Sequence, residues 1–206
     1  MKKLLILLFS LFLLSSSSVF ADDISDFSIE GISIGDSLLD YMTEEEILTE
    51  MEKSKGIYSH LKEPNKYLEV YLFKDFSSYD KISFFVKNNS TNEYVTNKNE
   101  KYTVLFIRGL IDYNEDFDSC IAKRDEVVEV LSEMFQNEDQ NEYKGIHRGD
   151  PSGNSIIDGY IIGFSSGANI QAQCNNFEET WRIKNKQTEG LSVAIVSDEI
   201  AKWFTN

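Results

Sequence analysis

Histidine is scarce in this chain: the 206 residues include only His60 and His147. Two isolated histidines do not provide the ligand spacing that is typical of a zinc site. They also restrict serine catalysis, because a serine nucleophile at neutral pH needs an adjacent base. The sequence therefore predicts no catalytic residue, no metal ligand and no cofactor.

Cysteine is almost as rare, with only Cys120 and Cys174 and no Cys-x-x-Cys pair. This pattern disfavours a thioredoxin-like redox role. In an oxidising compartment an even number of cysteines usually forms bridges. We expect a disulfide between Cys120 and Cys174, with two buried free thiols or one reactive cysteine as the alternatives.

Positive charge is also in short supply: 20 basic residues face 35 acidic ones, for a net charge of −15. Such a field repels phosphate backbones and anionic membrane surfaces. Nucleic acid is therefore not expected as a partner. The acidity itself indicates solubility rather than a particular ligand.

One apolar run stands out, and it lies at the N-terminus. Met1-Lys2-Lys3 precedes "LLILLFSLFLL", and "SSSSVFA" follows with Val19 and Ala21 at the small-residue positions of a cleavage site. This is the layout of a secretory signal peptide, residues 1–21, and the alternative is an uncleaved membrane anchor. The run is about half the ~20 residues of a membrane span. We expect cleavage after Ala21, no membrane insertion afterwards, and a periplasmic or secreted bacterial protein.

Cleavage removes two lysines and no acidic residue, which changes the net charge from −15 to −17. The remaining residues, 22–206, are enough for a single α+β domain. The order of the predicted elements also allows two similar αβββ halves, about 22–113 and 114–206.

Hydrophobic periodicity predicts the elements of this domain. Helices are expected from about 36 to 55, from 117 to 135 and over 198–204. Gln136–Asn154, with its glycines and a proline, is expected to be a loop, and we expect His147 within it, like His60, to be exposed and the two histidines not to be paired. Strands are expected over 67–73, 81–87, 102–113, 155–164, 168–174 and 191–197. The predicted order is α-βββ-α-βββ-α, and short connections between strands indicate a mostly antiparallel sheet with helices packed on it.

The letters G-D-S-L at Gly35–Leu38 match the opening motif of a family of serine esterases and lipases. Those enzymes also need an Asn from a G-x-N-D block and a histidine from Asp-x-x-His, and the sequence has neither. A helix start explains the motif better, because Asp36 or Ser37 can accept hydrogen bonds from the first turn of a helix. We expect Ser37 to be structural; the alternative is a GDSL-like nucleophile.

The run "GFSSG", Gly163–Gly167, fits the G-x-S-x-G pattern of another hydrolase fold. In that fold the catalytic histidine follows the serine along the chain, and no histidine follows Ser165. A turn between two strands is the simpler interpretation. A serine hydrolase that uses Ser165 remains an alternative function.

The acidic run "DYNEDFD" places Asp112, Asn114 and Asp116 at the first ligand positions of a calcium loop. Phe117 replaces the required glycine, and Lys123 replaces the twelfth-position glutamate. An acidic helix N-terminus accounts for the run at least as well. A weak cation site stays open at this point.

The stretch "DISDFSIEGISIGDSLLDYMTEEEI", together with "CNNFEETW" and "LSVAIVSDEIAKWF" near the end, resembles a family of small secreted proteins from marine bacteria. That family is uncharacterised, so the resemblance implies export and no activity. "GISIGDSLLDYM" also resembles the opening helix of outer-membrane assembly lipoproteins, whose lipid-bearing cysteine this chain lacks.

These observations favour a soluble exported protein that is a non-catalytic binding or scaffold module. Its expected partner is an unknown envelope protein or a small molecule. The alternatives are a serine hydrolase and a small-solute binding protein.

Overall fold

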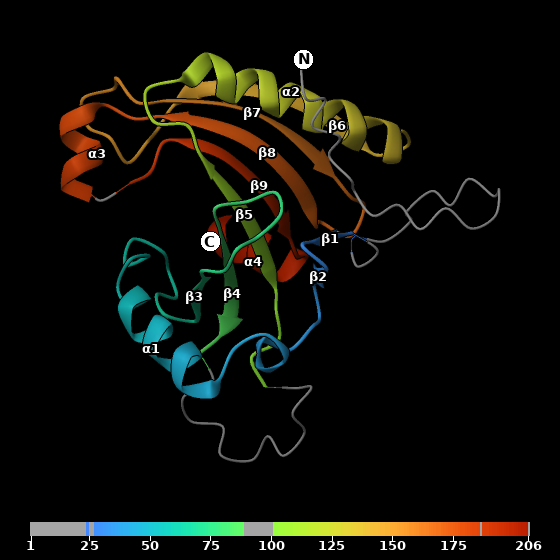
Figure 1. Cartoon of the computed structure of the whole chain (residues 1–206), viewed down its shortest axis with the longest axis vertical. Coiled ribbons are helices and arrows are strands. Elements are labelled where there is room, and N and C mark those ends of the chain that lie inside the picture. The colour runs from blue at the N-terminus through green and yellow to red at the C-terminus, as the bar shows by residue number, and fades with distance from the viewer. Residues whose placement is uncertain (1–23, 25–26, 89–100, 186, 206) are drawn as a thin grey trace.

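The computed structural model describes residues 24, 27–88, 101–185 and 187–205. Its centre is a seven-stranded antiparallel sheet with helices on both faces (Figure 1). The helices are α1 (Glu44–Ser54), α2 (Phe117–Met134), α3 (Glu179–Asn185) and α4 (Asp198–Thr205). The sheet strands are β3 (Tyr67–Leu72), β4 (Lys81–Lys87), β5 (Phe106–Asp112), β6 (Asp139–Ile146), β7 (Ile156–Gly163), β8 (Asn169–Asn176) and β9 (Gly190–Val196). A small hairpin, β1 (Ser28–Ile29) and β2 (Ile32–Ser33), precedes them.

The strand order in the sheet is β3-β4-β5-β9-β8-β7-β6. The last strand of each predicted half, β5 and β9, pair with each other at the centre, from Phe106–Val196 to Asp112–Gly190. One sheet therefore runs through both segments, 22–113 and 114–206. The predicted signal peptide, residues 1–21, lies outside the described residues.

One face of the sheet is the main apolar core. The inward residues of α1, Ile47 and Met51, pack there against β3 and β4. Helix α2 covers β7, β8 and β9 on the same face, as its position above β7 and β8 in Figure 1 shows. Thr43 precedes helix α1 as its N-cap, and its side chain forms a capping box with Glu46.

The opposite face is covered at one end by α4, together with Tyr58 and Leu61 from the segment that follows α1. Ile200 and Trp203 of α4 pack on Phe85, Phe106 and Val196. The strong amphipathic spacing of α4 explains this placement, since its buried residues Ile200 and Trp203 are three positions apart.

The predicted α+β class and the mostly antiparallel sheet are confirmed. The predicted order α-βββ-α-βββ-α is present with three additions: the β1–β2 hairpin, β6 and α3. The first predicted helix, from about 36 to 55, is divided into a 3-10 helix, Leu38–Asp40, and α1, because Thr43 caps a new helix start. The prediction of a loop over 136–154 was wrong for Asp139–Ile146, which is strand β6. That strand lies at the sheet edge and is held by main-chain pairing with β7. It therefore needs few β-branched residues, and the sequence lacks the apolar pattern that predicts a strand.

Cys120 of α2 and Cys174 of β8 lie at disulfide distance, with their Cα atoms 6.0 Å apart. Both side chains are buried between the helix and the sheet. Within the described part of the chain, no helix is both long and apolar enough to span a membrane.

Candidate functional site

Strand β8 separates two kinds of side chain by simple alternation. Ile170, Ala172 and Cys174 point into the core and are buried. The residues between them are amides, and each is half-buried on the opposite sheet face. We call this row the amide row; it consists of Asn169, Gln171, Gln173 and Asn175.

The amide row lies beside a charged residue of β5. The strand register places Gln171 opposite Ala194 of β9, and Ala194 opposite Arg108 of β5. Ala194 is small and buried. The long side chains of Gln171 and Arg108 therefore flank a small one on the same face of the sheet.

Arg108 is held by a buried carboxylate. Its Nη2 donates to Oε1 of Glu69 at 2.5 Å, and its Nε donates to Oγ of Ser83 at 3.1 Å. Glu69 is only 2% exposed, whereas the Arg108 side chain is 26% exposed. Glu69 and Ser83 therefore hold the guanidinium in place, while part of the Arg108 side chain stays accessible to solvent. Its Nη1 makes no hydrogen bond to any residue that the structure describes.

Burial and neighbouring groups act in opposite directions on the pKa of Arg108. Burial is the largest single effect and would lower this pKa, but attraction to Glu69, with smaller contributions from Tyr71 and Tyr58, raises it overall. Burial also raises the pKa of Tyr71, which accepts a hydrogen bond from Arg108, to about 12. Arg108 stays cationic and Tyr71 stays a neutral phenol at any physiological pH, so neither group can act as a general base.

Tyr143 of β6 closes the other side of the amide row. Its hydroxyl donates to Oε1 of Gln173 at 2.6 Å, across the intervening strand β7. The ring fits there because β7 has a glycine at the position between them, Gly159. Burial raises the pKa of Tyr143 to about 12.

The amides themselves are bonded in pairs along β8. Gln171 donates to Oδ1 of Asn169 at 2.7 Å, and Gln173 donates to Oδ1 of Asn175 at 3.1 Å. These bonds orient the side chains and leave further donors and acceptors on an accessible surface. We call the surface formed by the amide row, Arg108, Tyr71 and Tyr143 the polar face. Chemically it can form hydrogen bonds, but it presents no nucleophile with a base.

Ser37 is not part of this face. It is 3% exposed and caps the 3-10 helix Leu38–Asp40, whose Leu39 N–H donates to its Oγ at 3.3 Å. Its own hydroxyl donates to the Lys101 carbonyl at 2.8 Å. The predicted capping role is confirmed.

Ser165 lies in the turn between β7 and β8. The Gly167 N–H donates to the Phe164 carbonyl at 2.9 Å, which closes the turn. Gly167 has φ of +94°, a conformation that favours glycine. The predicted hairpin turn is confirmed, and Ser165 is exposed at its tip.

Two of the predicted ligand side chains of the DYNEDFD run, Asp112 and Asp116, have other partners. Asp116 caps α2 by accepting a hydrogen bond from the Ser119 N–H at 3.1 Å. Asp112 pairs with Lys81 at 3.2 Å. Among the described residues no group of acidic, histidine or cysteine side chains has the arrangement of a metal site.

The histidines differ in their surroundings. His60 is exposed and lies against Tyr58. His147, expected in an exposed polar segment, is instead half-buried and packs against the rings of both Phe177 and Trp181, with centroid distances of 5.2 and 5.0 Å. Its neighbour Asp150 is fully engaged by Ser152 and Ser155. Residues 147–154 form the predicted loop, but the expected exposure of His147 was wrong, because α3 packs onto the loop and its Trp181 donates to the Gly149 carbonyl.

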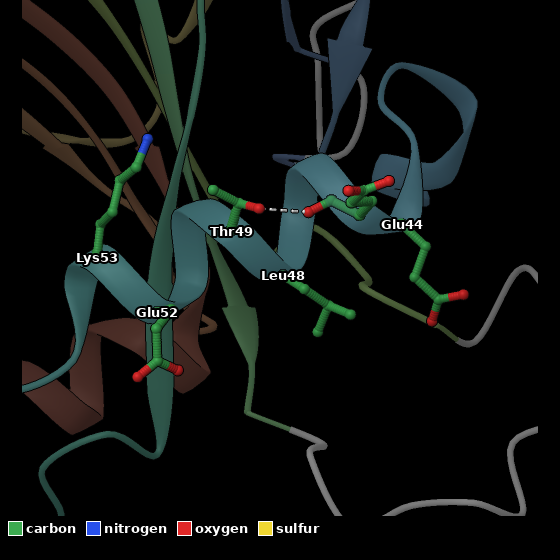
Figure 2. Close-up of a pocket in the computed structure, with 6 residues that line it drawn as sticks. Glu44, Leu48, Thr49, Glu52 and Lys53 are labelled. Carbon is green, nitrogen blue, oxygen red and sulfur yellow. Dashed lines mark hydrogen bonds between the residues drawn. The ribbon is translucent and has the colours of Figure 1, made fainter.

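A second surface is the outer side of α1, which Figure 2 shows in detail. Glu44, Leu48, Glu52 and Lys53 line it, and their side chains diverge from the helix rather than converge on one point. Thr49 is satisfied by the Glu45 carbonyl at 2.8 Å. This surface is a solvated helix face and offers no enclosed site.

Comparison of the chain with protein-family models, with curated proteins and with solved structures finds no match. The polar face therefore has to be interpreted from its own chemistry. Sequence reasoning did not identify its residues. The available signal was the alternation of amides with small apolar residues in "ANIQAQCNN".

Proposed function

We propose that this protein is an exported, non-catalytic binding module that holds a neutral, polyhydroxylated ligand, such as an oligosaccharide, on the polar face. The observation that carries the proposal is the amide row on a part of the sheet that α4 leaves free, flanked by Arg108 and Tyr143. Each amide offers both a donor and an acceptor, which suits hydroxyl groups.

Two further features support a neutral ligand. Arg108 already has a buried counter-ion in Glu69, so it can add a directed hydrogen bond without requiring an anion. The chain as a whole carries a net charge of −15, which repels polyanions.

An aromatic surface beside the polar face suits sugar rings in particular. Phe73, 66% exposed, stacks on Tyr71 with ring centroids 6.1 Å apart and extends the face.

The experiment is titration of the mature protein with a panel of neutral oligosaccharides, followed by calorimetry and by the rise in melting temperature. Gln171→Ala/Gln173→Ala should abolish binding of any glycan that the wild type binds. Gln136→Ala is the matched control, because Gln136 is an exposed amide at the end of α2 that bonds only the Glu133 carbonyl among the described residues. Absence of binding to every member of the panel, or equal binding by the double variant, would refute the proposal.

The hydrolase alternative has its own test. A fluorophosphonate probe should leave the native protein unlabelled, because Ser37 is buried and bonded and Ser165 lies at a turn. Labelling that disappears in Ser37→Ala or Ser165→Ala would favour an esterase. Export is tested by the N-terminal mass of the protein recovered from the bacterial envelope, which should begin at Asp22.

A further inference from the structure

Strand β6 presents an edge that pairs with no other strand of the described residues. It is eight residues long, is the last strand in the sheet order and pairs only with β7 among the described strands. Most of its residues are exposed. Helix α2 packs mainly on β7, β8 and β9, and the bonds of its last turn to β6 are made by the Gln140 side chain, not by the outward main-chain groups of the strand. A long edge of this kind is a ready template for another strand.

The hydrogen bonds to β7 show which groups point outward. His147 N–H donates to the Ser155 carbonyl at 2.8 Å, and this pair continues the β6–β7 register beyond Ile146–Ile156. In an antiparallel ladder the bonded positions alternate. The odd-numbered residues of β6 therefore bond to β7, and the even-numbered ones direct their N–H and C=O groups away from the sheet. These outward residues are Gln140, Glu142, Lys144 and Ile146.

We propose that a second copy of this chain pairs with β6 in antiparallel fashion, with Tyr143 of one copy directly opposite Tyr143 of the other. A two-fold axis normal to the sheet keeps equivalent faces of the two copies on the same side. Residues directly opposite each other then point to the same face, so the axis passes beside one residue of β6 that faces its own counterpart. Centring on Tyr143 places Glu142 of each copy opposite Lys144 of the other. Centring on either neighbour would place two glutamates or two lysines opposite each other, which is unfavourable.

The edge lysine can exchange its partner within the chain for one on the second copy. Lys144 is 67% exposed and bonds Asp158 at 2.7 Å within its own chain. Asp158 also pairs with Arg124, so it keeps a partner when Lys144 turns toward Glu142 of the second copy. Charged edge residues usually oppose strand pairing, but in this register their charges are complementary.

The dimer also joins the two polar faces. Tyr143 lies on the same face as Gln171 and Gln173, so the two copies of the face meet at the two-fold axis. One strand pair is a small interface, and we expect a weak, reversible dimer. This inference does not depend on the proposed ligand, because oligomeric state is measured without one.

Charge reversal tests the register. Sedimentation velocity of the mature wild type over a wide concentration range should show a monomer–dimer equilibrium. Glu142→Lys and Lys144→Glu should each weaken dimerisation by about tenfold, because each variant opposes like charges twice. A mixture of the two single variants should recover the dimer, since their edges are complementary. Circular dichroism verifies that each variant is folded.

Cross-linking gives an independent measurement. The described residues contain no free cysteine. Facing positions of a non-bonded pair have Cα atoms about 4.5 Å apart, so Tyr143→Cys should form a disulfide dimer on mild oxidation. Lys144→Cys is the control, because its two copies lie two positions out of register, beyond the ~7 Å limit for a bridge. A wild type that stays monomeric at every concentration, or charge reversals that leave the equilibrium unchanged, would overturn the proposal, as would equal cross-linking at 143 and 144.

Discussion

Tyr143 donates its hydroxyl to Oε1 of Gln173 at 2.6 Å, from a strand that is not adjacent to that of its acceptor. The strand between them, β7, has Gly159 at the crossing point. A Cβ atom added to this glycine would lie 2.5 Å from Cζ of the Tyr143 ring and 2.9 Å from Cβ of Gln173. The glycine is therefore what allows β6 to contribute to the polar face.

Gly159→Ala should displace the Tyr143 ring and break its bond to Gln173. We expect a loss of about 1 kcal/mol, because an overpacking cost of about 1–3 kcal/mol exceeds the gain of up to about 1 kcal/mol from replacing a strand glycine. Urea unfolding measures the change. Gly145→Ala is the control on β6, since a Cβ there meets nothing within 4 Å. Equal stability of the two variants would contradict the role given to Gly159.

The buried ion pair predicts an asymmetric response to mutation. Arg108→Met leaves the Glu69 carboxylate, 2% exposed, without its cation. Stability should fall by about 3 kcal/mol, which is typical when one partner of a buried pair is removed. Arg108→Met/Glu69→Leu should recover much of this loss, because no unpaired charge remains.

The matched control for the ion pair is Lys55→Met in the exposed pair with Glu52, whose side chains are 47% and 71% exposed. Its effect should stay below about 1 kcal/mol. Chemical denaturation gives the free energy of unfolding of the wild type, Arg108→Met, the double variant and the control. A double variant as unstable as Arg108→Met would mean that packing, rather than the unpaired carboxylate, determines the loss.

The strands that sequence reasoning located are those with a buried side. Phe84 and Ile170 belong to runs whose apolar residues repeat with the period of a strand, because one or both faces meet the core. Strand β6 lacks that signal: among its residues only Ile146 is aliphatic, and that side chain is 60% exposed. Its existence depends on main-chain pairing with β7, which is a tertiary property.

The polar face was missed for a related reason. Arg108 and Glu69 are 39 positions apart in sequence, and Tyr143 and Gln173 are 30 apart. Only the order β3-β4-β5-β9-β8-β7-β6 places them on one surface. Local signals, in contrast, were sufficient for the caps: Thr43 with Glu46, and Ser37 with Leu39.

Reduction of the disulfide between Cys120 and Cys174 should lower the melting temperature by several degrees. The bridge closes a loop with a sequence separation of 54, which corresponds to about 4 kcal/mol of chain entropy. Intact-mass measurement after alkylation, with and without prior reduction, tests the bridge directly. Alkylation of two thiols in the unreduced, denatured protein would contradict it. Cys120→Ala/Cys174→Ala, which cannot form the bridge, should show no effect of reductant on its melting temperature.

His147 should make the protein less stable in mild acid. Its Nδ1 is buried without a hydrogen-bond partner among the described residues, and the ring packs against Phe177 and Trp181. Burial lowers the pKa of His147, although the nearby Asp150 carboxylate partly opposes this shift. The unfolded chain therefore takes up the proton first, at a pKa of about 6.5. The stabilisation is complete above that pH and is lost as the pH falls below it.

The pH window separates this histidine from its acidic neighbour. Burial would raise the pKa of Asp150, but hydrogen bonds from Ser155 and Ser152 lower it to about 2. Its contribution is present above the unfolded pKa of about 4 and is lost only as the pH falls below it. We therefore expect the free energy of unfolding to decrease between about pH 7 and pH 5 in the wild type, and to change much less in His147→Phe, which keeps the aromatic packing. His60→Gln, which removes the other histidine, should behave as the wild type. An unchanged pH profile in His147→Phe would mean that other groups titrate in this range on unfolding.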